Sequence, residues 1–163
     1  PEMSRGLGDV YKRQSRLGRS QPKFDEAELL AFNTRFVRSM PYVFIRERIS
    51  AGEDFWNAVR GNLNRISDIT EWEDICHRPL EPVIEDRELT ALAAELLPPE
   101  PWNDDTFTLW MNEVKAQSGK KGRELFHPIR KALTAQENGP ELKILLPLIG
   151  REKACNRLKG IKA

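Results

Sequence analysis

Apolar residues spaced four apart mark the clearest helix in this sequence, within the run 119–134. The spacing places Leu125, Ile129 and Leu133 along one side of a helix. The other faces carry three basic residues, which are Arg123, Arg130 and Lys131. Two glycines also bracket two lysines just before the helix, and such a cationic turn can contact phosphate. Taken alone, the pattern is more typical of an ordinary amphipathic helix with solvated lysines.

The same helical spacing recurs along most of the chain and predicts about eight short helices. Besides the helix above, they are expected within residues 25–40, 41–52, 54–66, 70–76, 85–97, 104–118, 140–149 and 151–158. No stretch alternates apolar and polar residues as a strand would, and no hairpin turn or internal repeat of fixed period is found. The sequence therefore predicts an all-α fold.

Polar residues at the predicted helix ends support these boundaries. Asp25 precedes Glu28 by three residues, and Thr70 precedes Glu73 in the same way. Such a capping box contributes on the order of 1 kcal/mol. The pair Asp104–Asp105 is expected to cap the helix that follows it, and prolines separate several of the remaining helices.

The composition describes a charge-covered chain with room for one domain, or for one domain and part of another. It has 163 residues, 39% of them hydrophobic and 31% charged, with a formal net charge of +1. That charge excludes a uniformly basic nucleic-acid binder but permits a local basic patch. No apolar run is long enough to cross a membrane, and no signal peptide is visible. Cys76 and Cys155 stand apart without CxxC spacing, which favours a reducing, cytoplasmic location.

Residues 1–14 do not share the helical pattern of the rest. This segment, PEMSRGLGDVYKRQ, has no amphipathic period, and the chain does not start with methionine. Its end, GLGDVYKRQ, resembles translated sequencing-adapter read-through. We therefore predict that residues 1–14 are a non-native leader, extended or disordered, and they do not enter the fold prediction.

No arrangement of residues predicts a catalytic, metal or nucleotide site. The run 119–122 lacks the spacing of a phosphate-binding loop. His77 lies beside Cys76, but His127 and Cys155 stand alone, so a four-ligand metal set cannot be assembled and neither cysteine has a nucleophile motif. The four tryptophans are expected to pack in the core rather than stack on bases. We therefore predict no catalytic residue, no metal and no cofactor in this chain.

Three separated stretches resemble a known family. They are KGRELFHPIRKALT followed by NGPEL and LLPLIG, then GRSQPKFD followed by ELLAFN, and VRGNLNRISDITEWED. Together they resemble the C-terminal region of bacterial glutamyl-tRNA synthetase, with the alphaproteobacterial type most similar. The resemblance covers roughly residues 15–158.

The resemblance implies that the chain is the non-catalytic part of an enzyme. That family ligates glutamate to tRNA(Glu) with ATP and magnesium in a class I catalytic domain, whose HIGH-like and KMSKS-like motifs do not occur here. Residues 15–40 would end its stem-contact region, and residues 41–163 would form its anticodon-binding domain, a cage of helices. ATP and magnesium would bind the missing catalytic domain. The partner would be tRNA(Glu), with no membrane and no DNA, and the parent protein would be a cytoplasmic monomer.

The family motifs also imply which residues meet the anticodon. The arginine of the L-R-x-A-L-T element lies against the anticodon bases, and Arg130 holds that position here. The alternative role for Arg130 is a structural ion pair with a carboxylate such as Glu141. Ala135 stands where the family commonly has glycine, so the geometry after Thr134 is less defined. The residues implied in binding are Arg130, Thr134, Gly139, Pro140 and Leu142 for the anticodon, and Lys120, Lys121 and Arg123 for backbone phosphates.

Two other functions are compatible with parts of the sequence. Composition alone fits a helical protein–protein interaction module that binds no RNA. RNA binding that falls steeply with salt would separate anticodon binding from that module. A shortened relative that modifies tRNA fits less well, because such proteins usually lack an anticodon-binding region. Whether the parent charges only tRNA(Glu) or also tRNA(Gln) stays open.

Overall fold

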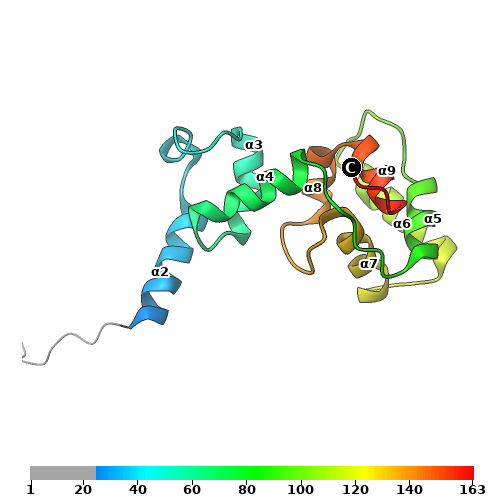
Figure 1. The fold of residues 1–163 in the computed structure, drawn as a ribbon, viewed down its shortest axis with the longest axis horizontal. Helices are drawn as coiled ribbons and strands as arrows, with labels where there is room; N and C mark the ends of the chain where they lie inside the picture. Colours follow the sequence, from blue (N-terminus) through cyan, green and yellow to red (C-terminus); the bar gives the residue numbers. More distant parts are fainter. Residues whose placement is uncertain (1–24) are drawn as a thin grey trace, which may run out of the picture.

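The computed structural model describes residues 25–163, and within them the fold is all-α, as predicted (Figure 1). These residues form eight α-helices and three short 3₁₀ helices, without a strand. The α-helices are α2 (Glu26–Ser39), α3 (Glu53–Val59), α4 (Ile69–His77), α5 (Arg87–Glu95), α6 (Thr106–Ser118), α7 (Arg123–Thr134), α8 (Leu142–Ile149) and α9 (Arg151–Leu158). The 3₁₀ helices are η1 (Tyr42–Phe44), η2 (Arg60–Asn62) and η3 (Ile66–Asp68). The predicted leader, residues 1–14, lies outside the described residues, as do residues 15–24 of the predicted stem-contact region.

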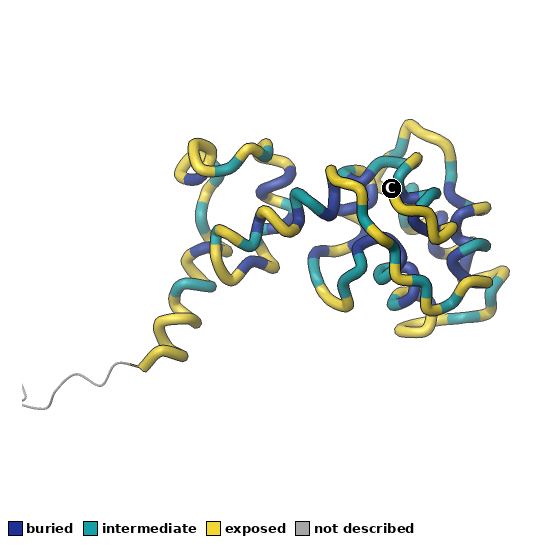
Figure 2. Tube along the Cα trace, in the orientation of Figure 1, coloured by how far each residue is buried: buried dark blue, intermediate teal, exposed yellow. Residues whose placement is uncertain are grey.

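The helices form two groups along the length of the molecule (Figure 1). Helices α2, α3 and α4 lie toward one end, and α5, α6, α7 and α9 gather at the other. Helix α5 packs against α6, α7 and α9, while α8 packs against α4 and α9 and so joins the two groups. Buried apolar side chains from both groups belong to one core cluster (Figure 2).

Helix α7 is amphipathic in the way its sequence predicts. The side chains of Leu125, Ile129 and Leu133 are all buried. Gly119 ends α6 with φ 69°, and Gly122 precedes α7 with φ 57°. Both are left-handed conformations that favour glycine, so these two residues define the short connection between α6 and α7.

Only one of three predicted helix caps is confirmed. Asp25 caps α2, accepting hydrogen bonds from two backbone N–H groups of its first turn at 3.0 and 3.3 Å. The prediction for Thr70 is wrong because α4 already includes this residue, and a side chain within the first turn cannot cap it. Before α6, the carboxylate of Asp105 makes no capping hydrogen bond, and Asn103 instead accepts from the N–H of Thr106 at 3.0 Å.

Residues 41–66 are less helical than their apolar spacing predicts. The two long helices expected there are replaced by turns and the short helices η1, α3, η2 and η3. Tertiary hydrogen bonds hold this backbone: Arg38 donates to the carbonyl of Leu63 at 3.1 Å, and Asn33 to that of Asn64 at 2.7 Å. Leu63 is nevertheless fully buried. The spacing therefore predicts burial here without predicting the backbone.

Three of the four tryptophans lie in the core, as predicted. Trp56, Trp72 and Trp110 are buried, and the fourth is partly buried against the same core. The indole N–H of Trp56 donates to the carbonyl of Met40 at 3.0 Å, and that of Trp110 to Ala93 at 2.9 Å. Each of these two rings thus buries its apolar body while its polar edge is satisfied.

A fully buried arginine, Arg157, ties α9 to α4 and α7. Its guanidinium donates to four backbone carbonyls, those of Ile75, Leu133 and Ala163 at 2.8 Å and that of Arg78 at 3.1 Å. Burial lowers its pKa from the ordinary arginine value. The carbonyl oxygens take the place of the water that the buried cation has lost, which is why the charge is tolerated.

Both cysteines are free thiols, one in the core and one partly buried. Burial raises the pKa of the Cys76 thiol to about 11, which makes it a poor nucleophile at neutral pH. Within residues 25–163, no group of three or more His, Cys, Asp or Glu side chains could hold a metal ion. None of the described helices is long and apolar enough to span a bilayer.

Candidate nucleic-acid interface

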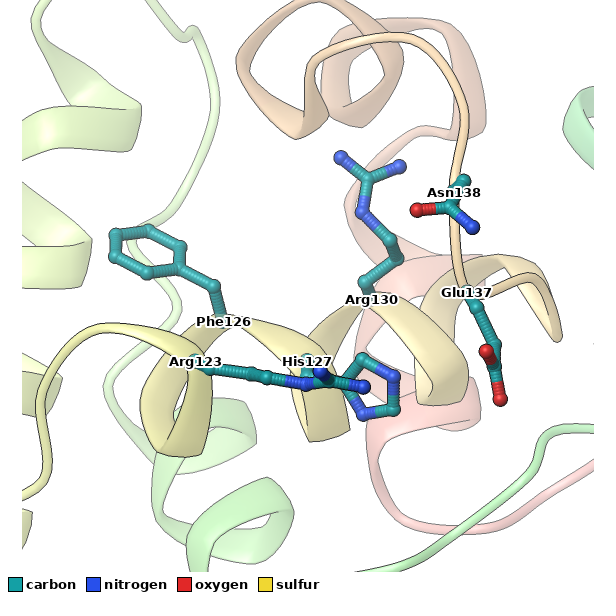
Figure 3. A pocket seen from close by; sticks show the side chains of 6 residues that line it. All are labelled: Arg123, Phe126, His127, Arg130, Glu137 and Asn138. Carbon is teal, nitrogen blue, oxygen red and sulfur yellow. The ribbon is translucent and has the colours of Figure 1, made fainter.

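An open pocket lies between α7 and residues 135–141, the connecting segment that leads to α8. Its volume is about 480 Å³, and its walls are Arg123, Phe126, His127 and Arg130 from α7 and Glu137 and Asn138 from the connecting segment (Figure 3). In Figure 3 the Arg123 side chain runs along α7 toward the ring of His127, and the Arg130 guanidinium rises beside Asn138. The pocket thus gathers two cations, an aromatic ring and polar groups, a set suited to an RNA loop.

The connecting segment begins with a left-handed residue that is not glycine. Ala135 has φ 55°, a conformation that costs an alanine about 1–2 kcal/mol, and its N–H donates to the carbonyl of Lys131 at 2.9 Å. The buried hydroxyl of Thr134 donates to the carbonyl of Arg130 at 2.8 Å and accepts from the N–H of Gln136 at 3.2 Å. The turn is therefore well defined despite the alanine, and Thr134 lies inside it rather than facing solvent.

The connecting segment rests on α4 at two points. The side-chain amide of Gln136 donates to the carboxylate of Glu71 at 2.8 Å. Gly139 lies directly against the ring of Trp72, since a Cβ atom at this glycine would lie only 2.1 Å from Cη2 of the indole. The predicted binding residue Gly139 is therefore required by close packing as well.

The guanidinium of Arg130 is held by the far end of the connecting segment. Its Nη1 donates to the carbonyl of Pro140 at 3.0 Å, the side chain is half-buried, and burial lowers its pKa. The alternative ion pair with Glu141 is not formed in the described part of the chain. The prediction that α8 begins at Pro140 is wrong: the extended backbone of Glu141 delays the helix until Leu142. Pro140 and Leu142 are both buried.

The three predicted phosphate-binding cations differ in what they already contact. Lys120 forms an ion pair with Asp86, and this contact, together with the N–H of Leu89, lowers the pKa of the Asp86 carboxyl. Lys121 and Arg123 are exposed and take part in no ion pair among residues 25–163. Lys121 and Arg123 are therefore the two that can bind phosphate without losing a partner.

A second carboxylate, Glu85, lies between two basic side chains of α7. Its Oε2 is 3.1 Å from Nδ1 of His127, and its Oε1 is 2.7 Å from Nζ of Lys131. Lys131 also reaches Oε1 of Glu137 at 3.3 Å. Hydrogen bonds from Lys131 and then from His127 lower the pKa of Glu85, and the two carboxylates raise the pKa of Lys131. The positive charge of α7 is thus partly neutralised beside the pocket.

Phe126, His127 and Glu137 line the pocket although the motifs did not point to them. A signal for Phe126 was present, because this residue follows Leu125 and so falls outside the apolar stripe of α7. Its ring is 43% exposed and core packing does not explain it. Glu85 leaves no such signal, since 42 residues separate it from the histidine that it contacts.

The described helices form a helical domain with an open pocket beside α7. A family model described as an anticodon binding domain matches residues 43–162, and the chain belongs to that family. This match confirms the anticodon-binding domain that the sequence motifs imply.

Several curated relatives extend the match to α2. The chain is 47% identical over 152 residues to glutamate--tRNA ligase 1 of Parvibaculum lavamentivorans, which covers 90% of this chain and 34% of the relative. It is 44% identical over 151 residues to glutamate--tRNA ligase 2 of Methylorubrum populi, and the aligned region covers 88% of this chain and 34% of that relative. Identity to glutamate--tRNA ligase 2 of Gluconacetobacter diazotrophicus is 43% over 150 residues, and the aligned region covers 88% of this chain and 33% of that relative. The chain therefore spans about a third of the length of these relatives.

Proposed function

We propose that this chain holds the anticodon arm of tRNA(Glu) as the C-terminal part of a longer glutamate–tRNA ligase. The pocket on α7 carries the proposal, because it combines an exposed aromatic ring with two arginines inside the matched region. The names of the relatives support the ligase, and their greater length leaves room for a catalytic part. That part would attach glutamate using ATP and magnesium, and no step of this reaction falls to the residues described here. The whole protein would be a cytoplasmic monomer that binds neither DNA nor membrane.

The exposed side chains of the pocket can each make a different kind of contact with the RNA. Phe126 offers a ring face on which an unstacked base can lie. Arg130 is held at Nη1 by a carbonyl and keeps its remaining N–H groups for a base edge or a phosphate. Lys121 and Arg123 can contact backbone phosphates, which position the arm without reading its sequence.

The other residues implied by the family motifs act indirectly in this proposal. These residues are Thr134, Gly139, Pro140, Leu142 and Lys120. The first four are packed within the fold and shape the connecting segment and the start of α8, whereas Lys120 forms an ion pair with a carboxylate of this chain.

Replacing Phe126 with alanine is expected to weaken binding of an RNA hairpin with the tRNA(Glu) anticodon-arm sequence by about 1–3 kcal/mol, the usual loss for a stacked base. The exposed ring contributes little to the core, so the melting temperature should barely change. Filter binding measures the affinity and circular dichroism the melting. Leu109→Ala on α6, 66% exposed and outside the pocket, is the matched control. Equal weakening by both variants would argue against stacking, and no binding by the unmodified chain would refute the proposed function.

Replacing Lys121 with glutamine is expected to reduce the salt dependence of the same binding. Each phosphate contact contributes about 0.7–0.9 to the slope of log affinity against log salt, so the slope should fall by about that amount. The exposed Arg46, which follows η1 at the other end of the molecule, supplies the control variant Arg46→Gln. Titrations at several salt concentrations give both slopes. If the Lys121 variant keeps the original slope, the lysine does not contact phosphate.

A further inference from the structure

The carboxylate of Glu85 determines which nitrogen of His127 carries the proton. An ionised carboxylate can only accept hydrogen bonds, so Nδ1 of His127, 3.1 Å away, must be the donor. Lys131 holds the other carboxylate oxygen at 2.7 Å, which keeps Glu85 ionised and fixed in orientation. In the neutral ring the remaining nitrogen, Nε2, therefore presents a lone pair.

That Nε2 atom is a buried side-chain polar atom that lacks a hydrogen-bond partner within residues 25–163. A buried unpaired acceptor is unfavourable, and a ligand that donates to it would remove the penalty. His127 lines the pocket, and the exposed side chain of Arg123 runs toward its ring (Figure 3). A phosphate that draws the Arg123 side chain away from the ring would leave this side of the imidazole more open to the ligand.

We propose that Glu85 is a positioning residue that makes Nε2 of the neutral His127 ring a hydrogen-bond acceptor, so that this atom selects a donor group of the bound nucleotide and disfavours a phosphate beside it. This inference rests on the proposed function. An unstacked nucleotide offers two kinds of donor, the N–H groups of its base and the 2′-hydroxyl of its ribose, whereas the phosphodiester of the backbone, a monoanion without an O–H group, only accepts. Glu85 itself touches no RNA and acts through the imidazole.

A glutamine at position 85 should invert the arrangement. Lys131 has only donors to offer, so the amide oxygen of the glutamine must face Lys131. The amide NH₂ then faces Nδ1 of His127, which becomes the acceptor, and the proton moves to Nε2. The pocket wall changes from acceptor to donor, while the size of residue 85 is preserved.

Nitrogen NMR of the imidazole rings tests this directly on the full 163-residue chain, which has two histidines. At about pH 8, where histidine is ordinarily neutral, the ring of His127 should carry its proton on Nδ1, and in Glu85→Gln on Nε2. A His77→Asn variant assigns the signals. A ring protonated on Nε2 in the unmodified chain overturns the inference, and this outcome does not depend on any variant folding.

The matched control is Glu137→Gln, because Glu137 also contacts Lys131 but forms no hydrogen bond with His127 among the described residues. Glu85→Gln should weaken binding of the anticodon-arm hairpin about tenfold, the loss typical of one mismatched buried hydrogen bond. Dimethyl phosphate, a phosphodiester without an O–H group, should shift the Nε2 signal in Glu85→Gln only. Glu137→Gln should leave the proton of His127 on Nδ1. Equal weakening by both variants would show that only the charge of Lys131 matters and would overturn the inference.

A third arm identifies the donor and separates the two proposals. A hairpin with deoxyribose in its loop lacks the 2′-hydroxyl. If Glu85→Gln still weakens binding of this hairpin about tenfold, the donor is a base. If the weakening disappears, the donor is the ribose hydroxyl. A hairpin bound equally well by the unmodified chain and by Glu85→Gln overturns the inference but leaves the proposed function intact. If the unmodified chain binds no hairpin, both fail together.

Discussion

Replacing Arg157 with methionine is expected to lower the free energy of unfolding by about 3–5 kcal/mol, because a buried carbonyl left without a donor costs about 1–3 kcal/mol. The guanidinium is fully buried and donates to four carbonyls, of which those of Ile75 and Leu133 would lose this donor in the buried interior. Methionine fills similar space but has no N–H group. Urea unfolding monitored by circular dichroism measures the change.

Two further variants make the Arg157 result specific. Arg157→Lys keeps the charge, but a single ammonium cannot replace the planar fork, so most of the loss should remain. Arg78→Met removes an arginine that is exposed and paired with Asp74 at 2.9 Å, and it should cost less than about 1 kcal/mol. Similar losses for Arg78→Met and Arg157→Met would mean that the four carbonyl contacts do not stabilise the fold.

Replacing Gly139 with alanine is expected to damage both stability and RNA binding. The new Cβ would lie 2.1 Å from Cη2 and 2.6 Å from Cζ2 of Trp72, so the connecting segment must move away from α4. Overpacking of this kind costs about 1–3 kcal/mol, and occasionally more. The shift would also pull the carbonyl of Pro140 from Arg130, so hairpin affinity should fall as well. Urea unfolding and filter binding measure the two effects.

Gly61→Ala is the control, because an added Cβ there meets no atom within 4 Å and its backbone is not left-handed. It should change stability by less than about 1 kcal/mol. Replacing Trp72 with the smaller leucine tests the same contact from the other side. In a Trp72→Leu background, Gly139→Ala should lower the free energy of unfolding by less than it does in the original chain. Additive losses would contradict the close contact between Gly139 and Trp72.

Local sequence signals predict the second half of this fold better than the first. The helices α5 to α9 follow from apolar spacing and from glycines that end helices, such as Gly119 and Gly150, because each helix there buries one clear stripe. Residues 41–66 have the same spacing, but their backbone is held by side chains of α2. Arg38 and Asn33 donate hydrogen bonds to backbone carbonyls of residues that are distant in the sequence. No local window contains that information.

The candidate site shows the same division. The motif around Arg130 pointed to α7 and the connecting segment, which line the pocket, and Phe126 could have been found as an aromatic residue outside the apolar stripe. The interior roles of Thr134 and Pro140 depend on how the chain turns after α7, which the motif does not describe. The contact between Glu85 and His127 depends on the packing of an extended segment on α7, and only the tertiary structure brings them together.

The seat of the connecting segment on α4 has a mechanical consequence. Gln136 donates a hydrogen bond to Glu71, and Gly139 packs closely against Trp72. The connecting segment is therefore attached to α4, in one group of helices, whereas the opposite wall of the pocket is α7, in the other group. Rotating one group against the other must therefore widen or narrow the pocket. Conversely, a ligand that contacts both α7 and the connecting segment would resist such a rotation.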